Sequence, residues 1–177
     1  PQLSFTVRHR YAHAGVVITA SHNPFHDNGF KAYFADGAQL VPPHAEEVVE
    51  RYEKISIQDL LPLLVAETNE ESWNILPTED DLAYRAALED AVLDPDILKD
   101  NAPKLVFTPI HGTGSISAIP ALWDHGVEVA VVDEQNKFDP NFSSVHSPNP
   151  ENPEALKKGI AVAQKTKSEF VLGSDPD

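Results

Sequence analysis

The chain has 177 residues, with 13 basic and 28 acidic side chains and a formal net charge of −15. A chain this negative lacks the basic surface that a nucleic-acid backbone requires, so we expect no nucleic-acid partner. It has no cysteine, which excludes disulfides, thiolate metal sites and a cysteine nucleophile. The longest apolar run, residues 60–66, is far shorter than the ~20 residues that span a bilayer, and no signal peptide is visible. We therefore expect no membrane partner and a cytoplasmic location.

The first forty residues alternate between helical and β-prone patterns. Residues 1–14 carry apolar side chains at every fourth position, which predicts a helix. Residues 15–20 form a short β-branched run, which predicts a buried strand. Residues 30–41 contain two β-prone runs separated by Asp36-Gly37, and this pattern is typical of a hairpin.

The next sixty residues are mostly helical. Residues 43–55 place Val48, Val49, Tyr52 and Ile55 on one face of a predicted helix. Residues 56–77 are expected to be irregular with a short helical piece. Thr78 opens a third helix as its cap, with Leu82, Ala86 and Leu93 on its apolar face. A Pro- and Asp-rich connector follows, and we place a domain boundary at residue 101.

After residue 102 the pattern changes to regular alternation. Strands are predicted at residues 104–110, 127–133 and 169–177, and helices at residues 116–126 and 153–167. Strands that alternate with helices favour a parallel sheet covered on both faces. The expected fold class is α/β, built from three-layer α/β/α domains with mixed sheets.

Ser21 stands directly after the first predicted strand. Ligands of open α/β sheets collect beyond the carboxyl ends of strands, so a hydroxyl in this place is a candidate nucleophile. A serine is a weak nucleophile unless a base is near or a group is already bound to it, and His22 and Lys31 are close enough in the sequence to assist. Ser, Asn and Pro also favour turns, so the residues alone leave a plain turn as the alternative.

A second polar cluster, Gly-Ser-Asp-Pro-Asp, occupies residues 173–177. Asp175 and Asp177 stand at alternate positions and can turn two carboxylate oxygens toward one point, which suits a hard cation such as Mg²⁺. Two carboxylates make an incomplete site, and an Asp-Pro turn is the alternative interpretation. A third ligand two residues further on would lie beyond residue 177.

The third candidate is the glycine loop His-Gly-Thr-Gly-Ser-Ile-Ser at residues 111–117. Glycines between a strand and a helix let a backbone approach an anion, and the start of a helix offers unpaired N–H groups. Gly112, Gly114 and Asp133 also match part of a dinucleotide-binding fingerprint, but Ser117 stands where its third glycine belongs. An NAD-binding domain is therefore kept as a rival interpretation.

Together these pieces resemble one known family. TASHNP at residues 19–24, followed by NGFK at residues 28–31, looks like the active-site serine loop of the α-D-phosphohexomutases, which include phosphoglucomutases and phosphomannomutases. VFTPIHGTG at residues 106–114 is similar to the opening of the second family domain. SPNPENPEAL at residues 147–156 is similar to the bacterial phosphoglucomutase branch, and GSDPD resembles the beginning of the family's metal loop.

The resemblance implies a role for each matching residue. Ser21 matches the family's phosphoserine, and Mg²⁺ would be bound by its phosphate, Asp175, Asp177 and a third aspartate that is not among these 177 residues. Lys31 matches the lysine that exchanges a proton with the sugar hydroxyl. His22 matches the histidine that contacts the phosphate or assists proton transfer.

Two further residues are assigned to substrate binding by the same resemblance. Asn23 is expected to hold the serine loop by hydrogen bonds. His111 falls in the second-domain loop near the cleft, although a capping role is the alternative for it.

The expected function is that of a phosphoglucomutase-like enzyme. It would interconvert glucose 1-phosphate and glucose 6-phosphate through a phosphoserine and a bisphosphorylated sugar, with Mg²⁺ as cofactor and glucose 1,6-bisphosphate as activator. A phosphomannomutase or a mutase acting on both sugars is the alternative, and a non-catalytic homologue is a further rival.

The chain is expected to be part of a larger protein. Residues 1–101 would be the C-terminal part of the first mutase domain, and residues 102–177 the second domain, truncated in the metal loop. The third and fourth domains, which recognise the hexose phosphate, would be missing, so the fragment alone is expected to be inactive. Residues 55–77 match nothing in the family pattern.

Overall fold

The computed structural model describes residues 1–64, 73–94 and 96–177. The chain divides into two compact units. The first comprises Pro1–Val17 and Phe30–Tyr84, and the second comprises Ile18–Gly29 and Arg85–Asp177. The serine loop therefore groups with the second unit although its flanking strands belong mainly to the first. The predicted boundary at residue 101 concerns domains of the whole protein and stays a prediction.

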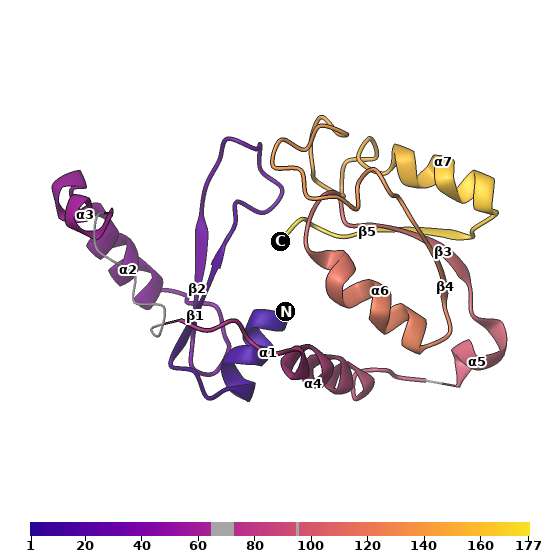
Figure 1. Cartoon of the computed structure of the whole chain (residues 1–177), viewed down its shortest axis with the longest axis horizontal. Helices are drawn as coiled ribbons and strands as arrows, with labels where there is room; N and C mark the ends of the chain where they lie inside the picture. Colours follow the sequence, from indigo (N-terminus) through magenta and orange to yellow (C-terminus); the bar gives the residue numbers. More distant parts are fainter. Residues whose placement is uncertain (65–72, 95) are drawn as a thin grey trace. The chain divides into compact units, whose positions relative to one another are not determined.

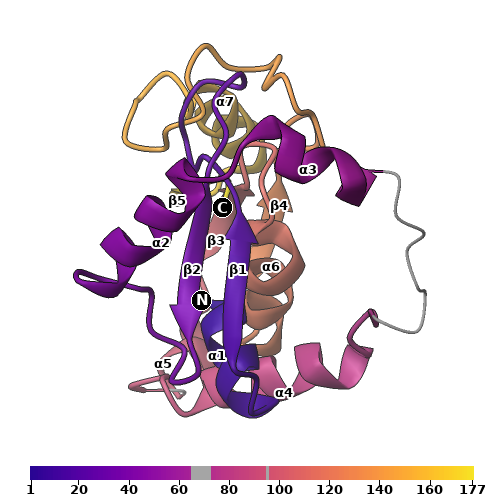
Figure 2. The ribbon, with the colours of Figure 1, turned by 90° about the vertical axis from the view of Figure 1, so that its left-hand side faces the viewer.

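The first unit contains most of the helices and a two-stranded sheet (Figure 1). Its elements are α1 (Gln2–His9), β1 (Ala14–Ile18), β2 (Phe30–Phe34), α2 (His44–Glu53), α3 (Ile57–Leu64) and the beginning of α4 (Thr78–Glu89). Figure 2 shows β1 and β2 running in opposite directions. The predicted helices and the first strand are confirmed, except that α4 ends at Glu89 and Leu93 lies beyond it. The turn at Asp36-Gly37 is also confirmed, and Gly37 has a φ of 78°. Beyond this turn Gln39 forms an antiparallel bridge to Tyr33. The Phe34 amide donates to the Ala38 carbonyl at 2.9 Å and the Leu40 amide to the Ala32 carbonyl at 2.8 Å, as in a hairpin.

The predicted burial of the first strand is wrong for one of its two faces. Val16 and Ile18 share one face of β1 and are 54% and 78% exposed, because alternate side chains of a strand point to opposite faces. The other face is the covered one, where a Cβ at Gly15 would lie 2.7 Å from Val7 in α1. The predicted apolar faces of α2 and α4 are likewise exposed, as Tyr52 at 65% and Leu82 at 55% illustrate.

The buried position in α4 is instead an acidic one. Asp80 is 4% exposed, and Arg10 donates to its two carboxylate oxygens at 2.7 and 2.6 Å. This two-pronged contact lowers the pKa of Asp80, while burial opposes the shift. An ion pair thus ties α4 to the end of α1 through a residue outside the apolar face that the periodicity predicted.

The second unit is a three-layer α/β/α structure and confirms the predicted fold class. It contains the end of α4, α5 (Ile97–Asn101), β3 (Lys104–Thr108), α6 (Gly114–Asp124), β4 (Glu128–Val131), α7 (Lys157–Thr166) and β5 (Phe170–Gly173). The three strands are parallel in the order β4-β3-β5. Figure 1 shows α6 and α7 on opposite faces of this sheet.

The core of the second unit follows the alternation of β3. Leu105 and Phe107 pack with Ile119 of α6 on one face, and Val106 packs with Ala163 of α7 on the other. All five side chains are at most 9% exposed. A central strand buried on both faces gives a rigid platform, and the loops after β3 and β5 begin at its carboxyl end. No helix in the described ranges is long and apolar enough to cross a bilayer.

Candidate active site

Ser21 lies at the tip of a tight turn in the loop that joins β1 to β2. The base of this loop is closed by the Thr19 amide, which donates to the Gly29 carbonyl at 2.9 Å. Ser21 has a φ of 57°, a left-handed conformation that non-glycine residues seldom adopt. Its amide donates to Thr19 Oγ1 at 2.8 Å, and this local bond supports the turn. The plain-turn interpretation is therefore right about the backbone, but the turn also projects the hydroxyl.

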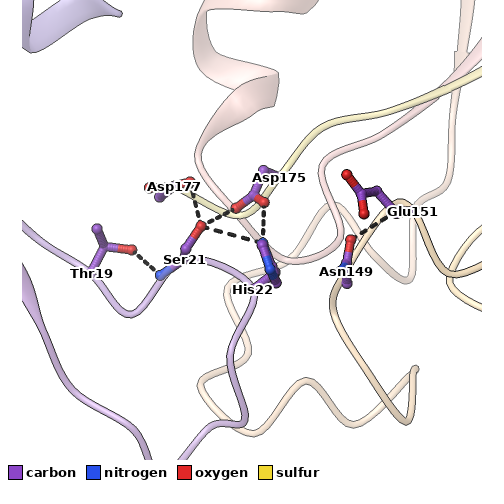
Figure 3. Close-up of polar contacts among 7 residues, drawn as sticks. All are labelled: Thr19, Ser21, His22, Asn149, Glu151, Asp175 and Asp177. Atoms are coloured by element: carbon purple, nitrogen blue, oxygen red, sulfur yellow. Dashed lines mark hydrogen bonds and ion pairs between the residues drawn. The ribbon is translucent and has the colours of Figure 1, made fainter.

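The Ser21 hydroxyl faces two carboxylates and a histidine, as Figure 3 shows. Its oxygen lies 2.9 Å from Asp175 Oδ1 and 3.1 Å from Asp177 Oδ1. His22 Nδ1 lies 2.6 Å from Asp175 Oδ2 and 3.4 Å from Ser21 Oγ. The structure thus brings together Ser21, His22, Asp175 and Asp177. Ser21 and His22 lie in the serine loop near the start of the sequence, and the two aspartates lie in residues 174–177, here called the acidic loop, at its end.

This arrangement concentrates negative charge around one hydroxyl. A serine carries a single proton and can donate it to only one of the two carboxylates. His22 must donate through Nδ1, because a carboxylate oxygen only accepts, and this leaves Nε2 as the basic nitrogen of the neutral ring. A further negative group bound to Ser21 would need a positive charge nearby.

The acidic loop is held against the glycine loop by backbone contacts. The Thr113 amide donates to the Pro176 carbonyl at 3.0 Å. A Cβ at Gly112 would lie 2.2 Å from the Pro176 Cα, and one at Gly114 would lie 2.3 Å from Ser174 Oγ. The glycines therefore allow close approach of the acidic loop. This contact is non-local, and only the adjacency of β3 and β5 would have indicated it.

His111 is a buried member of the same region. It is 8% exposed, its Nδ1 donates to the Lys137 carbonyl at 2.8 Å, and its Nε2 lies 2.7 Å from Ser144 Oγ. Both ring nitrogens thus bind the loop that follows β4. Asn23 stabilises the serine turn through its backbone amide, which donates to the Ala20 carbonyl at 3.1 Å. Substrate binding by either residue stays a prediction.

Lys31 lies in β2 and belongs to the first unit, whereas Ser21 belongs to the second. The proton-transfer role of Lys31 therefore stays a prediction.

A cavity of about 470 Å³ lies beside the serine loop, and Ser21, Asn23, His111, Lys137 and Asp139 are among the residues that line it. Much of its polar lining is already used within the protein. Asp139 accepts from the amides of Asn141 at 3.0 Å and Ser143 at 2.8 Å, and these bonds lower its pKa. The cavity offers room for a ligand next to the Ser21 hydroxyl, and its lining contains both acidic and basic side chains.

The donor set at Ser21 fits a hard cation in part. Across the described residues, no group of three or more His, Asp or Glu side chains is placed to share a metal ion. Asp175 and Asp177 nevertheless present two carboxylate oxygens toward the same hydroxyl. Oxygen donors of this type suit Mg²⁺ when a phosphoryl oxygen and further oxygens complete the set.

The second unit is of the class with an α/β/α platform, a serine at a strand end and an acidic loop facing it. Two family models match the chain: "Phosphoglucomutase/phosphomannomutase, alpha/beta/alpha domain II" over residues 83–177, and the corresponding domain I over residues 1–59. The chain belongs to the phosphoglucomutase/phosphomannomutase family.

Curated relatives and solved structures agree with this assignment. The phosphoglucomutases of Staphylococcus aureus strains MRSA252 and N315 are 35% identical over 100% of the chain, which spans 32% of their length. A putative phosphomannomutase from Thermus thermophilus is 26% identical with a TM-score of 0.72, covering 99% of this chain and 37% of that one. A phosphoglucomutase/phosphomannomutase family protein from Burkholderia thailandensis, 24% identical with a TM-score of 0.58 over 93% of this chain and 31% of its own, shares the fold. The chain therefore spans about a third of these relatives.

Proposed function

We propose that the full-length protein carrying this chain is a phosphoglucomutase that uses Ser21 as a phosphoserine. The observation that carries the proposal is the Ser21 hydroxyl, held in a left-handed turn within 2.9 and 3.1 Å of two carboxylates. A hydroxyl held in this way is available to react. The negative charge around it is the kind that a phosphoryl-transfer site balances with a cation. The 35% identity to proteins named phosphoglucomutase favours glucose phosphates over mannose phosphates.

The transfer conserves the phosphoryl group. Phosphorylated Ser21 gives its phosphoryl group to the free hydroxyl of the sugar monophosphate. The P–O bond to Ser21 breaks as the new P–O bond forms, Ser21 Oγ takes up a proton as it leaves, and a sugar bisphosphate results. The proton lost by the sugar hydroxyl passes to a basic side chain, for which Lys31 and the Nε2 atom of His22 are the candidates. The bisphosphate then returns its other phosphoryl group to Ser21, and the isomeric monophosphate leaves.

The acidic loop accounts for the proposed need for a metal. Two like charges ~4 Å apart cost about 4 kcal/mol at an effective dielectric of 20, so a phosphoserine beside Asp175 and Asp177 is unfavourable alone. We propose that Asp175, Asp177 and the Ser21 phosphate hold Mg²⁺. When bound, the ion would neutralise charge on the transferring phosphoryl oxygens. Glucose 1,6-bisphosphate would serve as the activator that loads Ser21.

A turnover assay tests the proposal. Full-length protein with Mg²⁺ and a trace of glucose 1,6-bisphosphate should convert glucose 1-phosphate to glucose 6-phosphate, and Ser21→Ala should show no turnover. The 177-residue chain alone should also be inactive, because it spans about a third of its relatives. Faster turnover of mannose 1-phosphate would replace the glucose assignment. No turnover of either sugar would contradict the mutase proposal.

A further inference from the structure

Two polar side chains lie in the interior of the second unit, away from the reacting groups. Thr108, the last residue of β3, and Gln135, in the loop after β4, have no exposed surface. Thr108 Oγ1 donates to Gln135 Oε1 at 2.7 Å, and Gln135 Nε2 donates to the Ala155 carbonyl at 3.3 Å. Buried polar groups that are satisfied in this way fix one arrangement of their surroundings.

The first thing this pair fixes is an unusual stretch of backbone. Ile110 and His111 have φ values of 46° and 63°, and a β-branched residue at positive φ is strained. The Ile110 amide donates to Thr108 Oγ1 at 3.2 Å, and the His111 amide donates to the Gln135 carbonyl at 2.7 Å. Strain of this kind persists only where surrounding contacts impose it, and here Thr108 and Gln135 supply two of them.

The acidic loop is bonded on both sides of Asp175, on one side to Thr108 and on the other to a residue close to the strained turn. The Ser174 amide donates to the Thr108 carbonyl at 3.0 Å. On the other side, Pro176 accepts from the Thr113 amide, two residues beyond the strained turn. One neighbour of Asp175 is thus bound to the backbone of Thr108 itself, and the other is bound to Thr113, which follows the turn that Thr108 and Gln135 support.

We propose that Thr108 and Gln135 are positioning residues that set the place of Asp175 beside Ser21. They act through the Ile110–His111 turn and the two backbone bonds to the acidic loop rather than by touching the serine. The consequence for catalysis rests on the proposed function. The consequence for the order of the acidic loop does not, so the two can be tested separately.

A matched pair of substitutions in the full-length protein separates the hydroxyl from the shape of Thr108. Thr108→Val keeps the shape and removes the hydroxyl, whereas Thr108→Ser keeps the hydroxyl and removes a methyl group. Loss of a group that orients the ligands of a site typically lowers activity ~10- to 100-fold, and we expect the lower part of that range for a pair that acts through the backbone. We expect Thr108→Val to lower kcat in that range with KM nearly unchanged, and Thr108→Ser to stay near wild type. Equal kcat in wild type and Thr108→Val, or equal losses in both variants, would overturn the proposal.

Hydrogen exchange supplies a readout that does not depend on turnover. In Thr108→Val, the amides of Ser174 and Asp175 should exchange faster, while the Val132 amide, bonded to the Phe107 carbonyl, should stay protected. Faster exchange throughout the second unit would show general destabilisation and overturn the proposal. If Thr108→Val does not fold, Gln135→Met is the second test with the same readouts, and loss of folding in both variants would also overturn it. If the wild type shows no turnover, the proposed function fails, and exchange alone decides whether the pair orders the acidic loop.

Discussion

Asp80 in the first unit and Asp175 in the second are both carboxylates held by two contacts, but their partners differ. Asp80 meets the Arg10 guanidinium at 2.7 and 2.6 Å and its side chain is 5% exposed. Asp175 meets the Ser21 hydroxyl and His22, and its side chain is 34% exposed. The first carboxylate is neutralised inside the fold. The second shares a hydroxyl with Asp177 and remains accessible, as expected of a group that works on a ligand.

The largest effect on turnover is expected from a substitution of Asp175. Asp175→Asn should lower kcat by about 100- to 1,000-fold, the range seen when one charge-stabilising group is removed from an active site. The fold should be unchanged because the Asp175 side chain contacts the serine loop rather than the core. Steady-state kinetics and a melting curve check this. Glu151→Gln is the control and should keep wild-type activity. Glu151 is an exposed acid near the site in Figure 3, and its backbone amide donates to Asn149 Oδ1.

The backbone support of the acidic loop gives the next largest effect. A Cβ at Gly112 would press on the Pro176 backbone at 2.2 Å, so Gly112→Ala must displace the loop that carries Asp175. Turnover should fall by about 10- to 100-fold, as for a group that orients a metal ligand. Gly126→Ala is the matched control, because no atom lies within 4 Å of its Cβ position. Its φ of 76° should cost ~1–2 kcal/mol of stability with kcat unchanged. Equal kcat losses in both variants would break the argument.

Asp80, the carboxylate paired inside the fold, is expected to affect stability rather than turnover. Asp80→Asn should lower the melting temperature by several degrees at about pH 7, because it leaves the Arg10 charge without its partner. The pKa of Asp80 is lowered from its ordinary value of 3.8 by the hydrogen bonds from Arg10. Its contribution is therefore complete above that ordinary value and is lost as the pH falls through the lowered one. The gap between wild type and Asp80→Asn should close in acid, and a gap that widened there would assign the wrong role to Asp80.

The smallest effect is expected at a surface pair. Lys104 Nζ lies 2.9 Å from Glu128 on neighbouring strands, with side chains 51% and 69% exposed. Exposed pairs contribute about 0–1 kcal/mol, so Glu128→Gln should shift the denaturation midpoint barely at all. A loss as large as that of Asp80→Asn would mean that burial does not explain the difference between the two ion pairs.

The sequence predicted the parts of the site that are local in the chain. The run before Ser21 and the acidic pair after β5 were each identified from a few adjacent residues, and the parallel alternation after residue 102 placed the acidic pair at a strand end. The supporting contacts were missed because they are non-local. Gly112 meets Pro176 only because β3 and β5 are neighbours in the sheet, and Gln135 reaches Thr108 across a loop.

In the first unit, the sequence predicted the elements but not which of their side chains are buried. The periodicity of apolar residues predicts which face of a helix is apolar. It does not predict whether another part of the protein covers that face. Asp80 illustrates this best. It lies in the first turn of α4, outside the apolar face chosen for packing, and only the distant Arg10 explains why an acid is buried there.

The central claim, that Ser21 carries the phosphoryl group, is tested most directly by intact mass. Full-length protein is incubated with glucose 1,6-bisphosphate and Mg²⁺, and wild type is compared with Ser21→Ala. We expect the wild type to gain a single phosphoryl group, mapped to Ser21, and the variant to gain none. No gain in the wild type, or an equal gain in Ser21→Ala, would contradict the phosphoserine mechanism.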